Sequence, residues 1–122
     1  MKKIVLFLLL LLIGCAHAPL DRTDESETTI ETPPVPSSGR AYYYYMLGIN
    51  AKIKWNLDEA LSYYQKAVEA DPESPVLKTE MADVLVKLGK IDEALLFAEE
   101  SYRKDPDNLT TLFVLGDIYT KK

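Results

Sequence analysis

Few side chains in this sequence are of a type that performs chemistry. Its 122 residues hold one cysteine, Cys15, and one histidine, His17, both near the N-terminus. A lone thiol excludes an internal disulfide, and a lone imidazole leaves no histidine for a catalytic triad or a zinc cluster further along the chain. No glycine-rich phosphate loop is present, and 14 basic against 19 acidic side chains lack the basic excess of a nucleic-acid binder. We expect no enzyme, no metal, no cofactor and no nucleic-acid partner, and neither a metal-binding nor a catalytic role for His17.

The first 14 residues have the composition of an export signal. Two lysines follow Met1, and residues 4–13 are then apolar without a break. A helix of that length covers about 15 Å, half the hydrocarbon thickness of a bilayer, so it is too short to span a membrane. A basic start, an apolar core and small residues behind it are typical of a secretory signal rather than of a buried N-terminal helix.

The end of this signal, Leu12-Ile13-Gly14-Cys15, resembles the lipobox of bacterial lipoproteins. In that family the cysteine thiol receives a diacylglycerol, cleavage before the cysteine frees its amine, and an N-acyl chain is added there. The resemblance implies that Cys15 carries the lipid. Ala16 after it implies the periplasmic face of the outer membrane in a Gram-negative source, or the outer side of the plasma membrane otherwise. An ordinary signal peptide cut after Ala16 or Ala18 is the alternative.

Residues 15–40 are predicted to form a disordered tether behind the lipid. The segment holds five carboxylates against two arginines, is rich in Ser, Thr and Pro, and is nearly free of large apolar groups. Such a composition cannot bury enough apolar surface to offset the entropy of ordering the chain. A flexible coil of this length has a root-mean-square span of about 25–30 Å, which prolines extend further.

From residue 41 onward the sequence repeats itself at a fixed interval. Asp58-Glu59-Ala60-Leu61 returns 34 positions later as Asp92-Glu93-Ala94-Leu95, and Asp71-Pro72 returns with the same period as Asp105-Pro106. Leu47-Gly48 aligns with Met81-Ala82 and then with Leu115-Gly116. Between these landmarks apolar residues step by three and four, which predicts helices over 41–54, 58–70, 75–88, 92–104 and from 109 onward. The repeats are then 41–74, 75–108 and a partial one, 109–122.

The predicted helix ends have physical causes. Gly89 can adopt the left-handed conformation that ends a helix, and Asp92 can cap the next helix with its carboxylate. Pro72 and Pro106 lack the N–H that a continuing helix needs. Small residues mark the places where paired helices are expected to cross closely: Gly48, Ala82, Gly116, Ala60 and Ala94.

This pattern resembles the tetratricopeptide repeat family, whose signature is W-x₂-L-G-x₂-Y, then A-x₃-F, then P. The first repeat matches with Tyr44, Leu47, Gly48, Ala51, Ala60, Tyr64 and Pro72. The second departs from it, because Lys78 replaces the aromatic residue and Ala98 the phenylalanine, while in the first repeat Trp55 replaces the usual turn glycine. The resemblance implies an all-α, right-handed superhelical solenoid of helix-turn-helix repeats.

In this family the first helix of each repeat lines a concave face that binds peptides or partner helices. The register places on that face Tyr42, Tyr45, Met46, Ile49 and Ile53, then Thr79, Glu80, Asp83, Val86 and Lys87, then Phe113, Val114 and Asp117. A family subgroup grips C-terminal carboxylates with Lys, Asn and Arg, but the matching places here hold Tyr45, Ile49 and Glu80, so that clamp is absent. The resemblance implies an apolar or mildly basic segment as ligand, although four consecutive tyrosines also serve simply to cover one helix.

The last predicted helix is apolar on more than one side, with Phe113, Val114 and Ile118 left over after packing on the second repeat. Further repeats beyond this sequence, self-association or a partner protein would each cover that surface. The first expectation is a membrane-anchored interaction scaffold of the bacterial cell envelope, serving assembly, secretion or pilus biogenesis. The alternatives are the N-terminal part of a larger envelope enzyme or assembly factor, and a self-assembling structural subunit.

Overall fold

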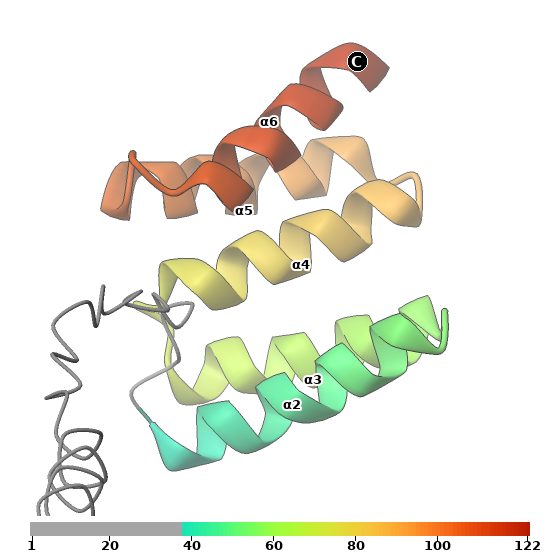
Figure 1. Ribbon diagram of the computed structural model, residues 1–122, viewed down its shortest axis with the longest axis vertical. Helices are drawn as coiled ribbons and strands as arrows, with labels where there is room; N and C mark the ends of the chain where they lie inside the picture. The colour runs from blue at the N-terminus through green and yellow to red at the C-terminus, as the bar shows by residue number, and fades with distance from the viewer. Residues whose placement is uncertain (1–37) are drawn as a thin grey trace, which may run out of the picture. The chain divides into compact units, whose positions relative to one another are not determined.

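The computed structural model describes residues 38–122, so the predicted signal, Cys15 and all but the last residues of the predicted tether lie outside it. The described residues form five α-helices and no strand: α2 (Gly39–Ile53), α3 (Leu57–Ala70), α4 (Pro75–Lys87), α5 (Ile91–Lys104) and α6 (Leu109–Lys121). Helices α2 and α3 form one antiparallel pair, α4 and α5 a second, and α6 lies against the second pair (Figure 1). The all-α prediction is confirmed.

None of the helices within residues 38–122 combines the length and the apolarity that crossing a membrane requires.

The helices begin and end within two residues of their predicted bounds. Helix α2 starts two residues before residue 41, because the Ser38 hydroxyl accepts a hydrogen bond from the Ala41 N–H at 3.4 Å and caps the helix. The prediction that Asp92 caps α5 is wrong. Lys90 is the N-cap residue, and Asp92 lies inside the first turn, where its charge favours the positive end of the helix dipole.

Three of the predicted stops are present. Gly89, after α4, has a φ of 77°, the left-handed conformation that glycine adopts without a Cβ penalty. Helices α3 and α5 end at Ala70 and Lys104, two residues before Pro72 and Pro106 respectively. The repeat therefore sets the helix boundaries through the same residue types in both copies.

Complementary side-chain volumes decide how closely each helix pair packs. A Cβ built on Gly48 would lie 2.5 Å from Cε1 of Tyr64, whose ring is fully buried against α2. One period later two buried alanines, Ala82 and Ala98, stand in place of the glycine and the tyrosine, so the two side chains at this crossing are of equal size. The predicted close crossing at Gly116 is wrong, because no atom of the described residues lies within 4 Å of a Cβ built there. The described residues contain no second helix of that repeat to make the crossing.

A second compensated pair explains why a lysine stands at the aromatic position of the second repeat. In the first repeat the Lys66 ammonium lies 5.7 Å from the centre of the Tyr44 ring, within reach of a cation–π interaction. In the second repeat Lys78, one period after Tyr44, pairs at 3.0 Å with Glu100, one period after Lys66. Both repeats therefore have an attractive contact between these two positions, a cation–π interaction in the first and an ion pair in the second.

The two junctions between repeats are built differently. The junction of the first and second repeats is apolar, with Ala67 and Leu77 buried and Tyr45 packed against them. The equivalent residues of the next junction, one period on, are Ser101, Thr111 and Thr79. Their buried hydroxyls hydrogen-bond to one another at 2.7–3.1 Å, and Ser101 also donates to the Pro75 carbonyl at 2.9 Å. Each of these buried polar groups therefore has a partner.

The glycines at equivalent positions of α2 and α6 should respond oppositely to alanine. We expect Gly48→Ala to lower the free energy of unfolding by about 1–3 kcal/mol, because the new Cβ overlaps the Tyr64 ring. Gly116→Ala should raise it by about 0.5–1 kcal/mol, since alanine favours the helix and its Cβ meets open space. Urea unfolding followed by circular dichroism measures both changes, and an equal response of the two variants would contradict this packing.

Candidate functional site

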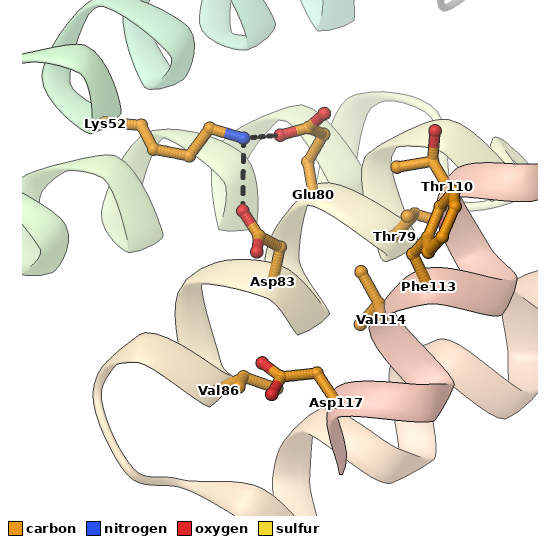
Figure 2. Close-up of a pocket in the computed structure, with 9 residues that line it drawn as sticks. All are labelled: Lys52, Thr79, Glu80, Asp83, Val86, Thr110, Phe113, Val114 and Asp117. Carbon is orange, nitrogen blue, oxygen red and sulfur yellow. Dashed lines mark hydrogen bonds and ion pairs between the residues drawn. The ribbon is translucent and has the colours of Figure 1, made fainter.

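Helices α4 and α6, together with one lysine of α2, border a cleft of about 320 Å³ on the face formed by the first helix of each repeat (Figure 2). This volume is at the lower end for ligand pockets and suits a side chain or a short segment of a partner. The cleft is lined by Lys52, Thr79, Glu80, Asp83, Val86, Thr110, Phe113, Val114 and Asp117.

The structure brings together most of the groove residues predicted for the second and third repeats. From α4 all of them except Lys87 line the cleft, and from α6 all three do so. Lys87 stands beside the cleft and forms an ion pair with Asp83 one helical turn before it. Phe113 is the most prominent apolar group, because 78% of its surface is exposed while Val114 beside it is buried.

The five residues predicted from the first repeat do not line this cleft. They form a stripe along α2 in which Tyr42, Met46 and Ile53 are exposed. Tyr45 and Ile49 are half-buried and pack against the core. The α2 stripe therefore offers apolar surface next to the cleft rather than walls for it.

Lys52 is the cleft residue that the sequence analysis missed. Its ammonium lies between two carboxylates of α4, forming ion pairs with Glu80 and, at 3.2 Å, with Asp83 (Figure 2). Glu80 also accepts a hydrogen bond from the Tyr64 hydroxyl at 3.3 Å. These contacts link α2, α3 and α4 across the boundary between the first two repeats.

The repeat register contained a signal for Lys52 and for Thr110, the other lining residue that was missed. Lys52 lies one period before Val86, and Thr110 lies two periods after Tyr42, so each occupies a position already assigned to the concave face.

The titration behaviour of this region is set by burial and by Glu80. Burial lowers the pKa of Lys52, but the charges and hydrogen bonds of Glu80 and Asp83 outweigh it, so the pKa is raised overall and the ammonium stays charged. Burial, followed by the charge of Glu80, raises the pKa of Tyr45 and of Tyr64, so both phenols stay neutral. Lys52 therefore stays charged, and the two phenols stay neutral, throughout the neutral pH range.

The carboxylates of the cleft are matched by lysines of the same domain. Glu80 and Asp83 pair with Lys52, Asp83 also pairs with Lys87, and Asp117 pairs with Lys121 one turn later on α6. Within residues 38–122 no group of three His, Cys, Asp or Glu side chains is placed to hold a metal ion. The arrangement places charge-balanced walls beside an exposed aromatic ring, a surface that can bind a partner.

Comparison with known proteins agrees with the repeat found in the sequence. A family model for the tetratricopeptide repeat matches residues 56–110, from the turn before α3 to the start of α6. Among curated proteins, the BBSome complex member BBS4 of Bos taurus is 32% identical over 75 residues. That match covers 62% of this chain but only 14% of the bovine protein, so this chain corresponds to a small part of it.

Among solved structures, the first TPR of Spaghetti (RPAP3), bound to the HSP90 peptide SRMEEVD, is 21% identical to this chain. The similarity covers 70% of this chain and 94% of that chain, with a TM-score of 0.42, a value too low to carry an argument about the binding surface. The assignment rests on the family match, the repeat period and the paired helices. The helical part of this chain is a tetratricopeptide repeat domain.

Proposed function

We propose that this chain is a lipid-anchored scaffold of the bacterial cell envelope that recruits a protein partner through the concave face of its tetratricopeptide repeats. The observation that carries the binding role is the cleft between α4 and α6, where an exposed aromatic ring stands beside charge-balanced walls. The envelope location rests on residues 1–16 alone. Assembly, secretion and pilus biogenesis are the envelope processes that such a scaffold serves.

The proposed ligand is an apolar or mildly basic helix or extended segment. Phe113 in the cleft and Tyr42 and Met46 on α2 offer apolar surface that a partner would remove from water. Three carboxylates and Lys52 line the cleft, and the lysines that balance the other charges, Lys87 and Lys121, are not among its lining residues. A basic residue of the ligand is therefore favoured over an acidic one at the rim. An acidic C-terminal tail would meet Glu80 where a carboxylate clamp needs a cation.

Exposed groove residues should control partner binding without affecting the fold. We expect Phe113→Ala and Met46→Ala each to weaken binding about tenfold or more, as truncation of a hot-spot side chain does, because both side chains are exposed on the proposed face. Leu96→Ala on α5 is the matched control, since Leu96 is exposed but lies outside the cleft. The measurement is photo-crosslinking in the cell envelope from residue 113 or 96, followed by affinity measurement with the captured partner. Adducts that form equally from both positions would reject the groove.

The anchoring role is proposed from the lipobox, which lies outside the described residues. Two or three acyl chains on Cys15 would hold the protein on a membrane, whereas a single chain gives marginal binding. Ala16 favours the periplasmic face of the outer membrane in a Gram-negative host. The acidic, proline-rich segment behind it would hold the repeat domain away from the headgroups.

Replacing the single cysteine should abolish anchoring. In a Gram-negative host, Cys15→Ser should remove all incorporation of labelled palmitate and move the chain out of the outer-membrane fraction. Ala16→Asp is the matched control, because it should keep the label but redirect the chain to the inner membrane. A mature N-terminus at residue 17 or 19, with no label, would instead establish an ordinary signal peptide.

Self-association through α6 is the second candidate, and a specific observation favours it. The expectation that Val114 and Ile118 are left uncovered is wrong, because both are buried, and of the three predicted residues only Phe113 is exposed. Leu112, Gly116 and Tyr119 are exposed instead, on the face that α3 covers in the first repeat and α5 in the second. Repeat arrays bury such faces by stacking a further helix on them. A second copy of the chain would supply that helix.

The mass of the mature chain in solution tests this candidate. We expect the light-scattering mass to rise with concentration for the wild type and to stay monomeric for Tyr119→Lys, which places a charge in the shared face. Thr120→Lys on the adjacent side of α6 should behave as the wild type. A monomeric mass of the wild type at every concentration would reject self-association and leave α6 to a different partner or a further domain.

A further inference from the structure

The turn between α2 and α3 has the same backbone as the turn between α4 and α5 but a different surface. In the first turn the N–H of Trp55 bonds to the Lys52 carbonyl and that of Asn56 to the Ala51 carbonyl, at 3.0 and 2.9 Å. In the second turn Gly89 and Lys90 make the equivalent bonds to Val86 and Leu85 at the same distances. Both are the helix-ending motif that requires one residue in the left-handed conformation.

Trp55 occupies that left-handed position in the first turn, with a φ of 63°. Among the described residues it is the only one other than glycine with a positive φ. A bulky side chain is disfavoured in this region, and Gly89 shows how the same fold avoids the penalty one period later. Packing does not compensate for the strain, because 67% of the Trp55 surface is exposed. Strain of this kind that persists without a folding benefit points to a function of the side chain.

Ile53 enlarges the exposed apolar surface of this turn, and we call Ile53 and Trp55 together the apolar tip. Ile53 is 79% exposed, and Lys54 between the two apolar residues is exposed as well. In the second turn the position of Ile53 is held by Lys87 and that of Trp55 by Gly89. The first turn therefore presents an isoleucine and an indole to the solvent where the second presents an ammonium and a bare backbone.

The size and shape of this tip favour a lipid bilayer over a protein as its occupant. A stable protein interface buries about 800 Å² on each partner, whereas a large aromatic side chain offers only about 150–250 Å². The tip is a turn that projects from the ends of two helices, not a groove. Tryptophan is enriched at membrane–water interfaces, and a neighbouring lysine can extend its ammonium to the headgroups. Asp58 and Glu59, which follow at the start of α3, offset Lys54, so anionic lipid should not be required.

We propose that Ile53 and Trp55 insert into the membrane–water interface and form a second, reversible contact of the repeat domain with the membrane. This inference rests on the lipid anchor of the proposed function, because two side chains alone bind a bilayer weakly and the anchor supplies a high local concentration. The 15 residues of α2 span about 22 Å between the predicted tether and the turn. The predicted span of the tether, about 25–30 Å, allows the turn to reach the membrane that holds Cys15.

The only tryptophan of the chain is Trp55, so its fluorescence reports on this turn alone. The mature chain, residues 15–122, is coupled through Cys15, its only thiol, to a maleimide lipid in phosphatidylcholine vesicles. We expect the emission to move to shorter wavelength and to be quenched by brominated acyl chains, with equal strength when a third of the lipid is phosphatidylglycerol. Chemical coupling makes the result independent of acylation in the cell, so this inference and the lipoprotein proposal fail separately.

Two variants separate docking from nonspecific adsorption. Ile53→Lys, which copies Lys87 of the second turn, should remove most of the quenching while leaving the fold intact. The double variant Trp55→Gly/Gly89→Trp moves the indole to the second turn, where it should show the emission of a fully hydrated tryptophan with or without vesicles. Quenching equal to that of the wild type in both variants would reject the specific contact.

Replacing Trp55 by glycine should relieve the backbone strain at this position and so stabilise the fold. Trp55→Gly should raise the thermal midpoint by about 4–8 °C, the shift expected for roughly 1 kcal/mol in a domain of this size. The gain in stability and the loss of bilayer contact would then come from the same substitution. An unshifted, unquenched emission of the tethered wild type overturns the proposal. So does a shift that occurs only when a protein partner is added, because it assigns the tip to that partner.

Discussion

The burial of α4 is the constraint on which the rest of the domain depends. Leu77, Val84 and Leu85 of this helix are buried on different sides, so α3, α5 and α6 must all pack against it. A helix surrounded in this way cannot fold alone, and neither helix pair can bury its own apolar surface without the other. The cleft depends on the same packing, because its walls come from α4 and from α6, which packs against α4. Lys52 of α2 completes the lining and forms an ion pair with Glu80 of α4.

The repeat period predicted most of the fold and all the lining residues of the cleft except Lys52 and Thr110. It located the helices and the left-handed residue at Gly89, because apolar spacing and helix-ending residues act locally and recur in each copy. It failed where a residue type was interpreted apart from its neighbours. Asp92 suits a helix start but lies past the cap position, and Gly116 marks a close crossing only when a second helix is present. Lys52 was missed although the register pointed to it, since the ion pairs that place it depend on two carboxylates of a different helix, far along the chain.

The ion pairs of the concave face give the binding surface its rigidity. Lys52 loses hydration on burial, and the carboxylates of Glu80 and Asp83 restore its hydrogen bonds, while the neutral phenol of Tyr64 donates to Glu80. Removing Lys52 would leave the Glu80 carboxylate, which is mostly buried, without its ion-pair partner, and such a loss costs more than the net stability of the intact pair. The first two repeats are thereby held in a fixed relation at the surface where a ligand would bind, so little ordering is needed when it does.

The hydroxyl cluster of the second junction has a consequence for assembly. Thr79, Ser101 and Thr111 satisfy one another, whereas Tyr45, Ala67 and Leu77 at the first junction carry no hydroxyl in the buried contact except the Tyr45 phenol. If a second copy of the second repeat stood where α6 stands, Leu77 would take the place of Thr111 and leave a hydroxyl short of a partner, a loss of about 1–3 kcal/mol. The two junctions thus work as a key for repeat order. Side chains at the junctions can therefore fix the order of repeats whose backbones are nearly identical.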